Sequence, residues 1–164
     1  MIFDLNIKDS KSIPNLLYDV CIIGSGAAGI TIANELGKAG IKVALIEAGS
    51  TEFTQESQDI YKGKITGDPY YSLDVARLRY LGGSTNHWGG MCRSFDEIDF
   101  NRSYLGEEYK WPIKYSELSK YLEDACKILE IPNDFEYLDF KQSIIKPIKF
   151  QFSPVKFKPK YQSH

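Results

Sequence analysis

Three glycines, Gly24, Gly26 and Gly29, lie between a run of apolar residues and a stretch of small ones. Glycines at this spacing let a chain turn tightly after a strand, bring its backbone close to a ligand and pack a helix against the strand. Free N–H groups at the start of such a helix bind phosphate oxygens. The pattern predicts a pyrophosphate-binding turn made of Gly24, Ser25, Gly26, Ala27, Ala28 and Gly29.

An acidic residue follows this turn at the interval that dinucleotide-binding units use. The apolar run 42–46 ends at Glu47, which Ala48 follows, about 20 residues past the glycines. A carboxylate there accepts the ribose hydroxyls of an adenosine and repels a 2′-phosphate, which argues against NADP. Taken alone, Glu47 fits a solvated acid at a strand end. The succession of strand, glycines, helix, second strand and acid favours nucleotide binding over a βαβ unit that binds nothing.

A second glycine cluster, RLRYLGGSTNHWGG, covers residues 77–90, and we call it the second glycine loop. Two Gly-Gly pairs frame polar side chains, which indicates a backbone that approaches a ligand closely and presents those side chains to it. Arg79 fits either a pyrophosphate contact or a surface salt bridge, and Asn86 either a ligand contact or a brace of the turn. Trp88 fits ordinary packing. The candidate contacts are Arg79, Gly82, Gly83, Thr85, Asn86 and His87.

These segments resemble the glucose-methanol-choline (GMC) oxidoreductases, flavoenzymes that oxidise alcohols and sugars. The resemblance rests on YDVCIIGSGAAG, IEAG, RYLGGSTNHWGG, WPIKYSELSKYLEDA and FQFSPVKFKPKY, which span residues 18–161. It implies an α/β fold, a Rossmann-like FAD-binding domain with a parallel sheet, here incomplete and followed by the beginning of a substrate domain. It also implies that the first glycines and Glu47 hold the ADP half of FAD, while residues 82–87 lie against the isoalloxazine ring.

The resemblance leaves the attachment of the flavin open. Several members carry, at the place of His87, a histidine bonded covalently to the flavin, and others hold FAD without a bond. The family's catalytic His-His or His-Asn pair lies near the C-terminus, so we expect the catalytic residues beyond this chain and assign none within it. The substrate is expected to be a small alcohol or sugar, and the electron acceptor could be a partner protein.

Two other functions fit parts of the same pattern. The first glycines and Glu47 do not separate FAD from NAD, so an NAD-linked dehydrogenase is one alternative, although it has no need of the second glycine loop. The other is a chain with no activity of its own, either truncated or completed by a partner subunit. The length of the family's members, several hundred residues, favours this second alternative for a sequence of 164 residues.

Composition narrows the class of protein further. With 164 residues, 43% of them hydrophobic, and a net charge of −2, the chain can bury a domain-sized core and offers no nucleic-acid surface. Three scattered cysteines form neither a disulfide framework nor a zinc site, and Cys21 is expected to be a small buried residue of a strand. The sequence shows no signal peptide and no transmembrane segment, which predicts a cytoplasmic protein.

The remaining pattern divides the chain into a polar leader (1–17), an FAD-binding domain (18–110) and the start of a remainder (111–164). A helix is expected over residues 26–39, with Ile30, Ala33 and Leu36 on its packed face and Gly40 just after its end. Residues 50–76 show no clear period. A second helix is expected from Ser116, as N-cap, to Leu129. Its predicted apolar stripe comprises Leu118, Tyr121, Leu122, Ala125 and Leu129.

The tail from Ile144 interleaves lysines with aromatic residues. That pattern occurs both in nucleic-acid-binding surfaces and in half-exposed strands, and we favour an extended strand. Pro147 and Pro154 interrupt it. His164 is the terminal residue, and nothing assigns it a catalytic role.

Overall fold

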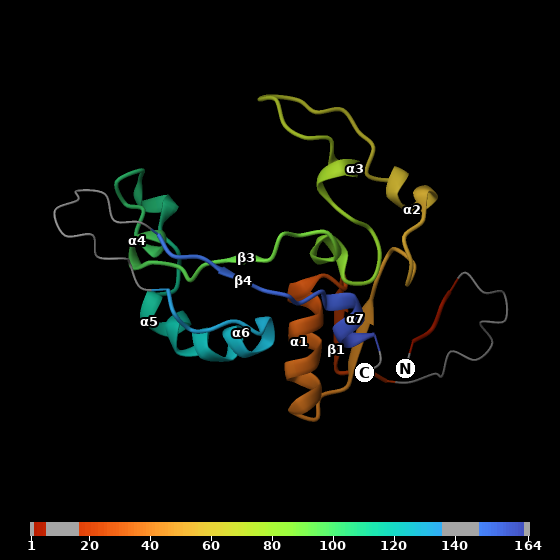
Figure 1. The fold of residues 1–164 in the computed structure, drawn as a ribbon, viewed down its shortest axis with the longest axis horizontal. Coiled ribbons are helices and arrows are strands. Elements are labelled where there is room, and N and C mark those ends of the chain that lie inside the picture. Colours follow the sequence, from red (N-terminus) through yellow and green to blue (C-terminus); the bar gives the residue numbers. More distant parts are fainter. Residues whose placement is uncertain (1, 6–16, 136–147, 163–164) are drawn as a thin grey trace. The chain divides into compact units, whose positions relative to one another are not determined.

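The computed structural model describes residues 2–5, 17–135 and 148–162 (Figure 1). The chain forms two compact units, residues 1–88 with 156–164, and residues 89–155. This grouping differs from the predicted division at 110/111, because residues 89–110 join the second unit and the last residues join the first. Most of the predicted leader, the start of the predicted tail and His164 lie outside the described residues. Within them, no helix is both long and apolar enough to cross a bilayer.

The first unit contains the predicted strand–helix–strand arrangement. Strand β1 (Val20–Ile23) and strand β2 (Val43–Ile46) pair in parallel, in a register that sets Val20 opposite Val43 and Ile23 opposite Ile46. Helix α1 (Ala27–Lys38) connects them and lies beside the strands in Figure 1. Parallel neighbours need such a crossover connection, so the expected α/β architecture is confirmed for this part of the chain.

The end of α1 follows from its sequence. Gly40 has φ +78°, a left-handed conformation that glycine adopts at low cost. Its N–H donates to the Gly37 carbonyl at 2.9 Å, and the N–H of Ile41 donates to the Leu36 carbonyl at 3.0 Å. This pair of bonds is the Schellman arrangement expected when glycine follows a helix. On the packed face, Ile30 is only 4% exposed, as predicted.

The prediction for Cys21 was wrong, because its side chain is exposed. Burial alternates along β1, and Ile22 is on the less exposed side, where its Cγ2 would lie 3.4 Å from a Cβ added to Gly29 in α1. Cys21 and Ile23 alternate to the other face of the sheet, and Ile23 is 85% exposed. A strand of a parallel sheet is buried only when both faces are covered, and the described residues cover one.

Residues 50–90 contain short helices, although the sequence has no clear period there. The elements are α2 (Gln55–Asp59), α3 (Leu73–Ala76) and the 3₁₀ turn η2 (Gly83–Asn86). Helix α2 begins at a capping residue, since the Ser57 N–H donates to Thr54 Oγ1 at 3.2 Å. Gly67 lies between α2 and α3 and has φ +96°, a conformation that favours glycine.

The tail is not one continuous strand. Strand β4 (Gln151–Phe152) is extended as expected, but Phe157–Tyr161 form helix α7, which belongs to the first unit. Burial does alternate along this segment, because Ser153, Val155 and Phe157 are all buried. The extended path ends where α7 begins, at Phe157. Pro159 is compatible with this helix because it lies in the first turn, where the backbone N–H that proline lacks would have no partner within the helix.

The second unit is built around a small antiparallel pair and an aromatic cluster. Strand β3 (Met91–Cys92) pairs with β4. Phe100 is 6% exposed, and its ring centroid lies 5.3 Å from that of Trp111 and 5.8 Å from that of Phe95. The helical segments are α4 (Glu97–Phe100), η3 (Glu107–Tyr109), α5 (Tyr115–Leu118), η4 (Ser119–Tyr121) and α6 (Leu122–Leu129).

The predicted helix 116–129 is present as the succession α5, η4 and α6, but its start and apolar stripe differ from expectation. The N-cap is Lys114, not Ser116, because the Glu117 carboxylate accepts the Lys114 N–H at 2.8 Å and so satisfies the first turn. Tyr121 is 61% exposed, Ala125 is exposed, and Cys126 is 4% exposed instead. The 3₁₀ turn winds more tightly than an α-helix and shifts which residues face inward.

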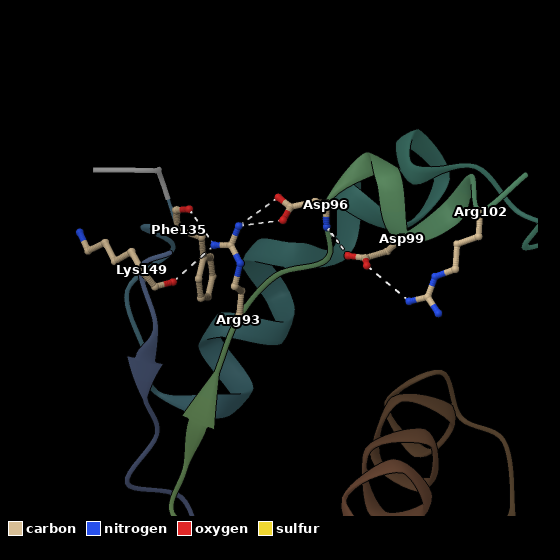
Figure 2. A network of polar contacts seen from close by, with 6 residues as sticks. All are labelled: Arg93, Asp96, Asp99, Arg102, Phe135 and Lys149. Atoms are coloured by element: carbon tan, nitrogen blue, oxygen red, sulfur yellow. Dashed lines mark hydrogen bonds and ion pairs between the residues drawn. The ribbon is translucent and has the colours of Figure 1, made fainter. Parts of the chain in front are cut away.

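Figure 2 shows the polar network that holds the second unit together. The side chain of Arg93 is 12% exposed, and its guanidinium donates to both carboxylate oxygens of Asp96, at 3.1 and 2.8 Å. The same guanidinium donates to the carbonyls of Phe135 and Lys149. Arginine suits this place because its fork of donors serves several acceptors at once. Its hydrogen bonds are used within the unit, which identifies Arg93 as structural.

Candidate functional site

The first glycine turn has the geometry that its sequence predicts. At the end of β1, Gly24 has φ +97°, where an L side chain is strained, and its N–H donates to the Ile46 carbonyl at 2.7 Å. Gly29 permits a close contact between the helix and the turn, because an added Cβ would lie 1.9 Å from the Gly24 oxygen. The turn therefore requires glycine at both position 24 and position 29.

Gly26 differs from these two glycines. A Cβ added to it meets nothing within 4 Å, so its front is open space. In the part of the chain that the structure describes, no hydrogen bond uses the N–H groups of residues 26–29. Open volume in front of unpaired amides at the start of a twelve-residue helix is the environment a pyrophosphate requires.

Glu47 closes the turn from the end of β2. Its Oε2 accepts from the Ser25 N–H at 2.8 Å and the Ser25 hydroxyl at 2.7 Å, while Oε1 accepts from the Gly49 N–H at 2.8 Å. Burial alone would raise the pKa of this carboxyl, but the hydrogen bonds from Gly49, Ser25 and Ala48 outweigh it and hold the pKa below the usual 4.5. The carboxylate is thus charged at neutral pH, and Ser25 beside it is fully buried.

This lowered pKa predicts a pH dependence of stability. A carboxyl whose pKa is depressed by folding stabilises the native state above its unfolded value and loses that contribution as pH falls through the folded value. Glu47→Gln is therefore expected to lower the free energy of unfolding at pH 7 by about 1 kcal/mol, and by less at an acid pH below the lowered pKa of the folded protein, where both side chains are neutral. Urea unfolding of both proteins at the two pH values measures this. An equal difference at both would contradict it.

The second glycine loop lies against the first glycine turn. The Gly82 N–H donates to the Ser25 carbonyl at 3.0 Å, and a Cβ added to Gly83 would lie 3.3 Å from the Gly26 Cα. Gly82 and Gly83 have φ +89° and +56°, so both adopt conformations that favour glycine. Two segments that are some sixty residues apart in the sequence are therefore in contact at Ser25 and Gly26.

Most polar side chains of the second glycine loop are used to hold its shape. Thr85 Oγ1 donates to the Gly82 carbonyl at 2.6 Å, and the Asn86 amide donates to the Leu81 carbonyl at 2.8 Å. Asn86 thus braces the turn, and its contact with a ligand stays a prediction. His87 is different, because its side chain is exposed and its imidazole has no hydrogen-bond partner among the described residues. It is the loop histidine available to a ligand.

Arg79 is hydrogen-bonded to helix α2 through both its side chain and its backbone. Its Nη1 donates to Ser57 Oγ at 2.7 Å, and its N–H donates to Gln58 Oε1 at 3.1 Å. Gln58 is 3% exposed and also donates to the carbonyls of Arg77 and Asp74. Helix α2 thus fixes the path of residues 77–79, at the start of the second glycine loop.

Sequence reasoning missed four residues that support this site. Gln58 and Ser57 carry no motif that would have singled them out. Gly49 could have been predicted, because a glycine two residues after the acidic Glu47 suggests close packing. In the structure, a Cβ added to Gly49 would lie 2.2 Å from the Arg79 oxygen. Lys158, treated as part of a strand, abuts Gly82, where an added Cβ would lie 2.8 Å from the lysine N.

Comparison with known proteins agrees with this geometry. Residues 19–132 match the FAD dependent oxidoreductase family, and the chain belongs to that family. Two curated oxidases are similar to it. They are 6'''-hydroxyparomomycin C oxidase of Streptomyces lividus, 27% identical, and paromamine 6'-oxidase of Streptomyces fradiae, 29% identical, each over 119 residues. These alignments cover 65% of this chain and 22% of each relative, so the chain spans about a fifth of their length.

The family uses FAD, and FAD is the cofactor of this chain. The residues present fit that cofactor. Gly26 leaves room for a backbone approach to its pyrophosphate, the unpaired amides that follow provide donors, and the charged Glu47 lies at the end of β2, where the ribose of a dinucleotide is bound. The specific contacts of the predicted residues with FAD stay a prediction.

Proposed function

We propose that this chain is the flavin-binding part of an oxidoreductase of the glucose-methanol-choline type, which oxidises a CH–OH group of a sugar or alcohol. The observation that carries the proposal is the contact between the two glycine segments, Gly82 with Ser25 and Gly83 with Gly26. A binding turn for a nucleotide alone needs no second glycine loop against it. A second loop that also carries the exposed His87 suits a cofactor with a ring system beyond its pyrophosphate.

In this proposal each part of the site has a distinct task. The amides of residues 26–29 bind the pyrophosphate, Glu47 accepts from the adenosine ribose, and Arg79 balances phosphate charge. Thr85 and Asn86 keep the loop rigid, so that His87 faces the flavin in a fixed orientation. Bound FAD supplies the acceptor for the hydride that leaves the alcohol carbon.

Support for the substrate class comes from the relatives and from the resemblance noted in the sequence. The relatives are named as oxidases of paromamine and of 6'''-hydroxyparomomycin C. The name of the latter compound includes a hydroxyl group. We propose by extension that a small sugar or alcohol is the reductant here. The proton-accepting residue is proposed to lie in additional sequence, as part of a longer polypeptide or a companion subunit, since the resembling family carries its catalytic pair near the C-terminus and His87 is proposed to face the flavin.

Anaerobic reduction of the bound flavin tests this function. We expect the 164-residue chain to bind FAD without bleaching when a sugar or alcohol is added, because hydroxyl oxidation needs a positioned base. Once the completing sequence is supplied, paromamine is expected to bleach the visible flavin absorbance. An analogue that has hydrogen in place of the reacting hydroxyl is the control and should leave the absorbance unchanged. Bleaching by the isolated chain, or by both compounds alike, would contradict the proposal.

A further inference from the structure

Helix α7 lies in the first unit although it follows the second glycine loop by about seventy residues. It contacts both η2, which forms the centre of that loop, and α1, whose start is the predicted pyrophosphate site. Figure 1 shows α7, in blue, beside α1. Phe157, its first residue, is 2% exposed and is the largest fully buried side chain among the described residues. Phe157 therefore anchors α7 at this place.

Lys158 contacts the beginning of the loop. Its backbone N and its Cβ would each lie 2.8 Å from a Cβ on Gly82, so only glycine leaves room for it. Its Nζ lies 2.5 Å from Glu52 Oε2 and 5.6 Å from the centroid of the Tyr80 ring. The lysine side chain is 15% exposed, and a shielded ammonium held by a carboxylate and an aromatic face is fixed in position.

Lys156 contacts the end of the same stretch. Its Nζ donates to the Trp88 carbonyl at 3.2 Å, directly after His87 in the chain. One short segment thus touches the loop on both sides of Thr85, Asn86 and His87. The polar side chains inside the loop fix its internal shape, whereas these two lysines connect it to the rest of the first unit.

We propose that Lys156 and Lys158 form a lysine clamp, a pair of positioning residues that hold the second glycine loop in the conformation that receives the flavin. The inference rests on the proposed role of that loop in flavin contact. The clamp acts through Tyr80, Gly82 and Trp88 and not by touching the cofactor. The alternative role for a lysine near a pyrophosphate, direct binding of phosphate, is disfavoured for Lys158 because its ammonium already pairs with Glu52.

The experiment compares Lys158→Met with a matched control. Methionine keeps the length of the side chain and removes its charge, and Glu52 is 70% exposed, so no buried carboxylate is left unpaired. The control, Lys110→Met, breaks a lysine–glutamate pair of similar length, 2.6 Å, in the other unit. Hydrogen exchange of the peptide that covers residues 80–88 is measured without FAD, and the dissociation constant for FAD is measured separately.

We expect the loop peptide of Lys158→Met to exchange about three- to fivefold faster than that of wild type, with α6 unchanged and FAD bound correspondingly more weakly. Lys110→Met should behave as wild type in the loop. Loop exchange in Lys158→Met no faster than in Lys110→Met would overturn the clamp. So would weaker FAD binding with unchanged loop exchange, because that result indicates direct contact between the lysine and the cofactor.

A charge exchange supplies the rescue. The double variant Glu52→Lys with Lys158→Glu restores an ion pair and is expected to slow loop exchange relative to Lys158→Glu alone. Failure of the proposed function looks different from failure of the clamp. If the loop exchanges faster in Lys158→Met and the wild-type chain does not bind FAD, the clamp stands and the flavin role of the loop falls. If wild type binds FAD and neither readout changes in Lys158→Met, the clamp falls and the flavin role stands.

Discussion

Replacing Gly29 with alanine is expected to destabilise the first unit by about 3 kcal/mol and to abolish FAD binding. The added methyl would lie 1.9 Å from the Gly24 oxygen, a backbone atom that cannot move without opening the turn. Since the same turn presents the open amides, the loss of its geometry removes the pyrophosphate site as well. Chemical unfolding and FAD titration measure the two effects.

Gly37→Ala is the matched control for this substitution. Gly37 lies in the same helix, but a Cβ there meets nothing within 4 Å. Alanine is favoured over glycine inside a helix, so this variant should gain about 0.5 to 1 kcal/mol and bind FAD as wild type does. If Gly29→Ala were as stable as Gly37→Ala, the close contact between α1 and the turn would be wrong.

Replacing Gly26 with asparagine is expected to separate binding from stability. Gly26 is the N-cap of α1 with φ −72°, a conformation that any residue adopts, and asparagine is a favourable N-cap. The free energy of unfolding should therefore stay within about 1 kcal/mol of wild type. The side chain fills the space in front of the amides and displaces the pyrophosphate, so FAD affinity should fall about a hundredfold, the equivalent of two lost charge-assisted hydrogen bonds.

Both effects of Gly26→Asn are measured on one preparation, by urea unfolding and by quenching of flavin fluorescence. Full FAD affinity in the variant would show that the cofactor does not approach Gly26. A large loss of stability would show that the space in front of Gly26 is filled by the protein itself. Gly29→Ala is thus expected to lose both stability and FAD binding, whereas Gly26→Asn is expected to lose FAD binding alone.

The parts of the fold that the sequence predicts are those that local physics determines. The turn at Gly24, the close contact at Gly29 and the helix end at Gly40 each require a residue without a side chain, and the sequence places glycine at each. The parallel pairing of β1 and β2 follows because a helix connects them. These features all lie within one strand–helix–strand unit of consecutive sequence, residues 20–46.

The predictions that failed depend on contacts between distant segments. Cys21 has the setting of a buried strand residue, but its exposure depends on what covers the far face of the sheet. Lys158 belongs to a pattern that suits a strand equally well, and only its contact with Gly82 reveals a part in the site. Gln58 is likewise an ordinary polar residue until the carbonyls it binds are known.

The central claim is that the first glycine turn and Glu47 form a site for FAD. Titration of the purified wild-type chain with FAD, NAD and NADP tests it most directly, with the dissociation constants determined under one set of conditions. We expect tightest binding of FAD and weakest binding of NADP, because the charged Glu47 repels a 2′-phosphate and the second glycine loop is proposed to serve a flavin. Tightest binding of NADP would show that this site is not built for FAD.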